Sequence, residues 1–206
     1  FQRLGHTLSK VKRLPNLARM LLAFLLYNSG VGTIIVIAAG YGKDELGLST
    51  ETLIACVLLI QFVGLPATFA YIALAKRVGT RTSILIGIVV YAGVVIYAMQ
   101  IETATEFWIL GVLVGLVQGG TQAMSRSLYG SMIPEGMSAE FFSFFSVFSK
   151  VGPFFGPFLF AAVKDTTGSS RMAILFLIVF FILGFFALLT VNGEKGRAEA
   201  KAFPAE

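Results

Sequence analysis

Polar side chains recur at helical spacing inside one apolar segment of this 206-residue chain. Gln118, Gln122 and Arg126 follow one another at intervals of four residues, and Ser125 lies beside them. Residues four apart share one face of an α-helix, so these groups form a single polar stripe. Such a stripe can bind a polar solute or an ion. The alternative is structural: the glutamines hydrogen-bond a neighbouring helix, and the arginine extends to the polar boundary.

A second polar face contains the only charge deep inside an apolar segment. Ser143, Ser146 and Lys150 recur at three- and four-residue spacing. At 1.5 Å per residue, Lys150 lies roughly 13 Å beyond Phe141, where that segment begins. In a bilayer, a cation at such depth costs about 2.5–3.5 kcal/mol. We predict that Lys150 acts on a solute, an ion or a conformational change; the alternative is a structural ion pair or hydrogen bond.

Glycine and proline follow Lys150 in the same segment, at Gly152, Pro153, Gly156 and Pro157. Proline inside a helix frees a backbone carbonyl and favours a kink or a break. These four residues are candidates for a conformational hinge. A static kink with close helix packing at the glycines is an equally good interpretation.

Three further residues complete the candidate set. Asn28 and Gln61 are single amides in two other apolar segments, where packing alone is a common explanation. Glu140 and Arg126 flank the short connection between the two polar segments, and we predict that they form an ion pair that holds one conformation.

The elements that must position these residues are six membrane-spanning helices. The chain is 56% hydrophobic and 13% charged, with a mean hydropathy of +0.84, which is too apolar for an ordinary soluble domain. A helix needs about 20 apolar residues to cross a bilayer. Nearly charge-free windows of this length are Met20–Gly42, Thr52–Ala75, Thr82–Ile101, Phe107–Ser125, Phe141–Val163 and Met172–Gly193. The expected fold is an all-α integral membrane bundle of six transmembrane helices.

Short connections imply antiparallel neighbours, and the basic residues predict their orientation. Twelve of the sixteen lysines and arginines, Arg3 among them, fall on one side of this arrangement and three on the other. Basic residues are enriched on cytoplasmic loops, so both termini are predicted to be cytoplasmic. We interpret residues 1–16 as a cytoplasmic linker, 17–193 as the bundle and 194–206 as a cytoplasmic tail. The opening residues are typical of a linker that arrives from an upstream segment.

Several functions fit the residue inventory poorly. No span core holds a histidine, aspartate or glutamate, and the motifs H-E-x-x-H and G-x-S-x-G are absent from the sequence, which disfavours an intramembrane enzyme. One cysteine, Cys56, cannot form a multi-cysteine metal site, and no cofactor is expected. The basic residues show no nucleic-acid motif. A six-helix channel or a structural membrane scaffold is the main alternative to a carrier.

The stretch from Gly115 to Pro157 resembles a branch of the major facilitator superfamily, the one related to the yeast vacuolar amino-acid effluxer of autophagy. The stretch reads GLVQGGTQAMSRSLYGSMIPEGMSAEFFSFFSVFSKVGPFFGP. The residues that match are Gln122, Ser125, Arg126, Ser127, Pro134, Glu140, Phe141, Phe142, Lys150, Gly156 and Pro157. The resemblance extends from Leu17 to about Gly193.

The resemblance implies that these six helices are the C-terminal half of a twelve-helix secondary transporter. Such a protein moves a small solute, with amino acids as the candidate class, by rocking two halves around a site at the membrane midplane. The implied partners are the solute, an N-terminal six-helix half and the lipid bilayer. The implied location is a membrane crossed several times, with a bacterial inner membrane as the expectation.

Overall fold

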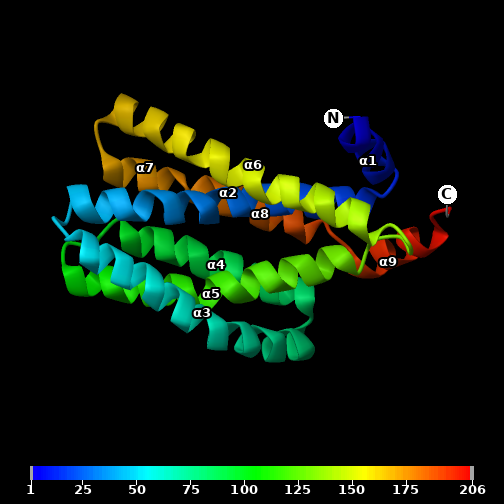
Figure 1. The fold of residues 1–206 in the computed structure, drawn as a ribbon, viewed down its shortest axis with the longest axis horizontal. Coiled ribbons are helices and arrows are strands. Elements are labelled where there is room, and N and C mark those ends of the chain that lie inside the picture. Colours follow the sequence, from blue (N-terminus) through cyan, green and yellow to red (C-terminus); the bar gives the residue numbers. More distant parts are fainter. Residues whose placement is uncertain (1, 205–206) are drawn as a thin grey trace.

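The computed structural model describes residues 2–204, and this part of the chain contains nine helices and no strand (Figure 1). Residues 1, 205 and 206, and the side chains of Gln2, Arg3, Leu4 and His6, lie outside the described part. In chain order the helices are α1 (Gln2–Lys12), α2 (Pro15–Asp44), α3 (Thr50–Val78), α4 (Thr80–Ala98), α5 (Ala104–Gly130), α6 (Ser138–Thr167), α7 (Ser170–Phe176), α8 (Ile178–Leu189) and α9 (Gly193–Ala202).

All six expected spans are confirmed as helices that are long and apolar enough to cross a membrane. Five of them are α2 to α6, and the sixth, Ser170–Leu189, consists of α7 and α8. Most helices extend a few residues beyond the apolar windows, because their ends are polar caps. Ser49 accepts from the N–H of Thr52 at the start of α3, and Thr103 with Glu106 forms a capping box at the start of α5.

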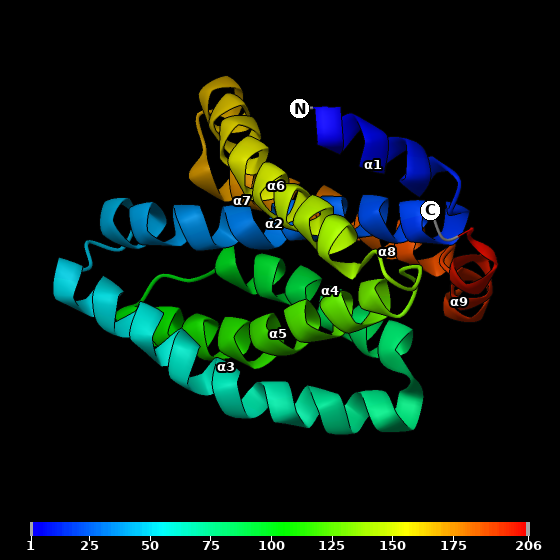
Figure 2. The same ribbon diagram turned by 45° about the vertical axis from the view of Figure 1, so that its right-hand side comes forward.

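The six spans form two groups of three that pack against each other. In one group α2 contacts α6 and α8; in the other, α5 contacts α3 and α4. The contact between α4 and α8 joins the groups. Figures 1 and 2 show the helices of both groups lying along the long axis of the bundle. The helices α1 and α9 lie together at one end of this axis. We call this the basic end, because it also holds Lys76, Arg77 and Arg126 at the ends of α3 and α5.

Small residues bring α2 and α6 into close contact. A side-chain carbon added at Gly152 would lie 2.6 Å from Oγ of Ser29, and one at Gly156 would overlap the hydroxyl of Thr33. Gly32 in turn accommodates the ring of Pro153. Both prolines lie within α6, which remains one helix from Ser138 to Thr167, so the expected break after Lys150 is absent. The structure shows the close packing at the glycines, and a hinge role for Gly152, Pro153, Gly156 and Pro157 stays a prediction.

We expect Gly156→Ala to lower the melting temperature of the purified protein. The new methyl group would overlap Thr33 and would lie 3.1 Å from the backbone oxygen of Ser29. Overpacking of this kind costs about 1–3 kcal/mol. The matched control is Gly93→Ala in α4, where nothing lies within 4 Å. Alanine is favoured over glycine in helices by about 1 kcal/mol, so this variant should melt at the same or a higher temperature. Equal melting of the two variants would contradict the packing argument.

The segments outside the spans are also helical. The segment expected as a linker contains α1, and the segment expected as a tail contains α9. Both pack on the bundle: α1 contacts α2 and α6, and α9 contacts α2. The division of the chain into linker, bundle and tail is still an interpretation, but neither end segment is extended.

Candidate functional site

A chain of hydrogen bonds links three spans near the middle of the bundle. Nε2 of Gln122 in α5 donates to Oδ1 of Asn28 in α2 over 2.8 Å. Nδ2 of Asn28 donates to the backbone oxygen of Ser149 in α6 over 3.0 Å. Asn28 is therefore the central member, and it is buried. Two predicted residues, Asn28 and Gln122, are brought together by the fold.

Pro153 explains why Asn28 bonds to the backbone oxygen of Ser149 in α6. In a helix, the N–H of residue 153 would bond to the carbonyl of residue 149, but proline has no N–H. The oxygen of Ser149 is left without its helical donor, and Asn28 supplies one from α2. A buried carbonyl without a partner is costly, so this bond couples the position of α6 to α2. Ser149 was not among the residues predicted from the sequence, although counting four residues back from Pro153 finds it.

A second buried polar contact lies between α2 and α5. The hydroxyl of Tyr27 is 2.5 Å from Oγ of Ser125, which also donates to the backbone oxygen of Thr121 over 2.6 Å. A hydroxyl carries one proton, so Tyr27 is the donor in the first bond when Ser125 donates to Thr121. The hydroxyl of Ser125, a predicted residue, thus bonds to two protein groups and joins α5 to α2.

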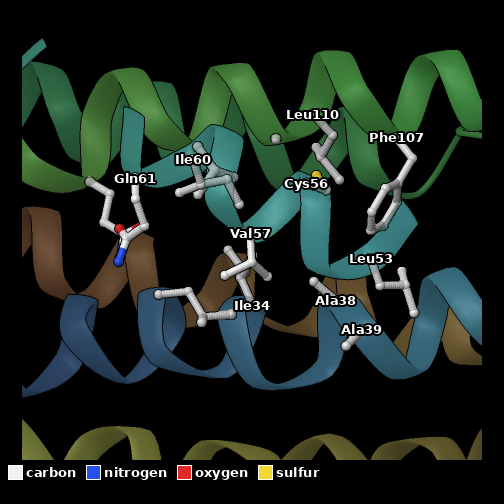
Figure 3. A pocket seen from close by; sticks show the side chains of 14 residues that line it. Ile34, Ala38, Ala39, Leu53, Cys56, Val57, Ile60, Gln61, Phe107 and Leu110 are labelled. Carbon is white, nitrogen blue, oxygen red and sulfur yellow. The ribbon is translucent and has the colours of Figure 1, made fainter. Parts of the chain in front are cut away.

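An apolar pocket of about 120 Å³ lies between α2, α3 and α5 (Figure 3). Its wall includes Ile34 and Ala38 from α2, Cys56 from α3 and Leu110 from α5. Two predicted amides complete the lining: Gln61 from α3 and Gln118 from α5. Oε1 of Gln118 is buried and has no hydrogen-bond partner among the described residues. The pocket can hold a mainly apolar group and offer it amide donors and acceptors.

Lys150 does not join this hydrogen-bonded chain. Its side chain is exposed on α6, as are Ser143 and Ser146. Both serine hydroxyls donate to backbone oxygens one turn earlier in α6. Within the described part of the chain, Lys150 has no hydrogen bond and no ion pair. The helical face predicted from spacing is present, but it points away from the six helices, because the phenylalanines and glycines of α6 occupy the buried face.

The predicted ion pair between Arg126 and Glu140 is absent among the described residues of this structure. Glu140 bonds instead to α1: Oγ1 of Thr7 donates to it over 2.6 Å, and Nζ of Lys10 lies 3.3 Å away. Arg126 is exposed at the end of α5. The difference arises because α1 folds back over the start of α6, and short-range spacing contains no information about such a long-range contact.

A family comparison agrees with this architecture. A model of the family described as vacuole effluxer Atg22 like matches residues 1–201, and the chain belongs to this family. The fold and the comparison together define a six-helix membrane protein of the Atg22-like family.

The chain is also similar to several individual proteins. It is 39% identical over 194 residues to a protein of Bacillus subtilis (strain 168) named uncharacterized MFS-type transporter YxiO, covering 94% of this chain and 45% of that protein. It is 26% identical over 217 residues to autophagy-related protein 22-1 of Penicillium rubens, covering 98% and 37%. With autophagy-related protein 22 of Cryptococcus neoformans var. neoformans the identity is 29%, covering 93% and 36%. The chain therefore spans less than half the length of these relatives.

Proposed function

We propose that this chain is one half of a secondary transporter, which moves a small solute by alternating access together with a second six-helix half. The observation that carries the proposal is the apolar pocket with its two glutamine amides, next to the hydrogen-bonded chain of Gln122, Asn28 and the Ser149 carbonyl. A carrier requires a solute site and contacts that connect this site to other helices of the bundle.

The exposed faces of α3 and α6 support a second half as the partner. Only 11% of the apolar window is buried in each of these helices, the lowest share among the six spans. Large apolar side chains such as Phe62 and Phe154 would be covered equally well by lipid. Lys150 and Gln61, however, are exposed on the same two helices, and both are costly to place against lipid. A protein surface with polar partners fits these helices better than a bilayer does.

The pocket favours a neutral solute with an apolar side chain, such as an amino acid of that kind. Its lining is mainly aliphatic and aromatic, and its polar groups are uncharged amides. Amides can bond both an ammonium group and a carboxylate without charge of their own. Lys150, which is exposed on α6 outside this pocket, is available to a carboxylate of the second half or to an anionic group of a solute bound between the halves.

The family and the six apolar helices make this an integral membrane protein. We propose a bacterial inner membrane, with the basic end and both termini in the cytoplasm. The support is the collection of lysines and arginines at the basic end, since such residues are enriched on cytoplasmic loops.

The test is solute flux in proteoliposomes that contain the full-length transporter. We expect saturable exchange of neutral amino acids, and we expect Gln118→Leu to raise the half-saturation concentration about tenfold through loss of one hydrogen bond to the solute. The melting temperature should be unchanged or higher, because leucine removes a buried oxygen that has no partner in the described chain. The control is Gln100→Leu, an exposed glutamine just past α4.

Two results would contradict the proposal. Flux that does not saturate and cannot be driven by counter-transport would indicate a channel. Normal flux with normal half-saturation in Gln118→Leu would place the solute elsewhere in the bundle.

A further inference from the structure

The C-terminal helix α9 is bound to the start of α2 through one buried residue, Asn16. Its backbone N–H and Nδ2 both donate to the carboxylate of Glu199, over 3.1 and 2.6 Å. Its Oδ1 accepts from the backbone N–H of Asn192 over 3.0 Å. Asn192 in turn caps α9 by accepting from Glu194 and Lys195. These three hydrogen bonds of the buried residue Asn16 hold α9 against α2 in a defined position.

The same helix also reaches the connection between α5 and α6. Gly196 is buried in α9, and a side-chain carbon there would overlap Sδ of Met132 and would lie 3.3 Å from Cβ of Asn16. Met132 is fully buried in that connection. Figure 1 shows α9 directly beside this connection at the basic end. The helix therefore fits between the start of α2 and the end of α5.

The N-terminal helix α1 makes the corresponding contact with α6. Glu140, in the first turn of α6, bonds to Thr7 and Lys10 of α1. The guanidinium carbon of Arg13 lies 5.4 Å from the ring centre of Phe203, so the end of α1 also contacts the segment after α9. Together, α1 and α9 touch the basic ends of α2, α5 and α6.

The basic end holds both an aromatic contact between the helices and a hollow of about 350 Å³ between α4, α5 and α9, with Thr80 and Ser127 in its wall. Near the basic end, Phe145 of α6 stacks against Phe24 of α2 at 4.3 Å and against Tyr129 of α5 at 4.8 Å between ring centres. At the opposite end, a hollow of about 150 Å³ lies between α2, α6 and α7, with Tyr41 and Phe160 in its wall. The contacts of Phe145 with Phe24 and Tyr129 must separate if the basic ends of α2, α5 and α6 are to move apart.

We propose that α1 and α9 form a brace that holds the basic ends of α2, α5 and α6 together, and that its release opens the bundle at this end. The brace consists of the contacts of Asn16 with Glu199, Gly196 with Met132, and Glu140 with Thr7 and Lys10. It lies outside the pocket and the Asn28 chain. Its role is independent of which solute is carried.

Hydrogen exchange measured by mass spectrometry on the protein in lipid nanodiscs tests the brace. Glu199→Gln keeps the shape of the side chain but removes its charge, and Asn16→Ala removes the bonds from the Asn16 amide. In both variants, amides of residues 131–145 should exchange roughly tenfold faster, because weaker closure populates the open end more often. Residues 40–50 at the opposite end should be unaffected. The control is Glu194→Gln, an exposed carboxylate on α9 whose side chain makes no bond to described residues.

A second measurement separates opening of the bundle from simple loosening of α9. Ser125→Cys, in a Cys56→Ala background, places a thiol at a fully buried position facing α2. Labelling of this thiol by a small maleimide should speed up in the Glu199→Gln variant by a similar factor. Faster exchange without faster labelling would overturn the brace, as would equal acceleration throughout the chain or no change in residues 131–145.

Discussion

Replacement of Lys150 by alanine is expected to reduce transport about 100-fold, since losing a charged hydrogen-bond partner is worth about 1.5–3 kcal/mol. The melting temperature should hardly change, because the side chain is exposed and makes no bond within the described residues. Substrate flux and thermal melting of the reconstituted full-length protein measure the two effects separately.

Two further variants define what Lys150 does. Lys150→Arg should also impair transport, because a planar guanidinium does not replace a compact ammonium at a fitted site. Lys164→Ala is the matched control: it lies in the last turn of the same helix and is exposed. If Lys150→Ala transports at the normal rate and affinity, Lys150 has no role in the site, and the second half is not its partner.

Asn28→Ala is expected to have the largest effect on stability. It removes the acceptor of Gln122 and the donor to the Ser149 carbonyl, leaving two groups unpaired inside the bundle. Each such group costs about 1–3 kcal/mol. Thermal melting measures the loss. Ser29→Ala is the control, because among the described residues this neighbouring hydroxyl bonds only to the Leu25 oxygen of its own helix.

The loss of stability in Asn28→Ala should depend on Pro153. In a Pro153→Ala background, residue 153 regains an N–H that can bond to the Ser149 oxygen, so the Asn28 donor becomes partly redundant. The cost of Asn28→Ala should then be smaller than in the original sequence, a coupling that a double-mutant cycle measures. An unchanged cost would show that Asn28 does not serve the carbonyl freed by Pro153.

The six spans could be predicted from sequence because a helix must have about 20 mainly apolar residues in a row to cross the hydrocarbon core of a membrane. The structure confirms each of them, and the small differences at their ends come from caps such as Ser49 and Thr103. The polar stripe of α5 was also recognisable from its four-residue spacing, and Gln122 does contact another span. Local periodicity reports which residues share a face.

Periodicity does not report which neighbour that face meets. Lys150 and Asn28 were both candidates, yet only Asn28 points into the bundle, because the direction of each face depends on how all six helices pack. The pocket was missed for the same reason: its wall comes from three helices, and most of its residues look like ordinary lipid-facing apolar residues. The partner of Glu140 lies 130 residues away in sequence, beyond any local pattern.

The grouping of the helices has a consequence for biosynthesis. Asn28 and its partner Ser149 are 121 residues apart in the chain. At about 5–20 residues per second, a ribosome needs roughly 6–24 seconds to make the intervening segment. Helices α3, α4 and α5 follow one another directly and can pack as they emerge, whereas α2 must wait for α6 and α8. Gln122 of α5 reaches Asn28 first, but the Asn28 donor and the glycine-lined face of α2 stay uncovered until α6 emerges, so assembly of the bundle is completed only when α6 and α8 arrive.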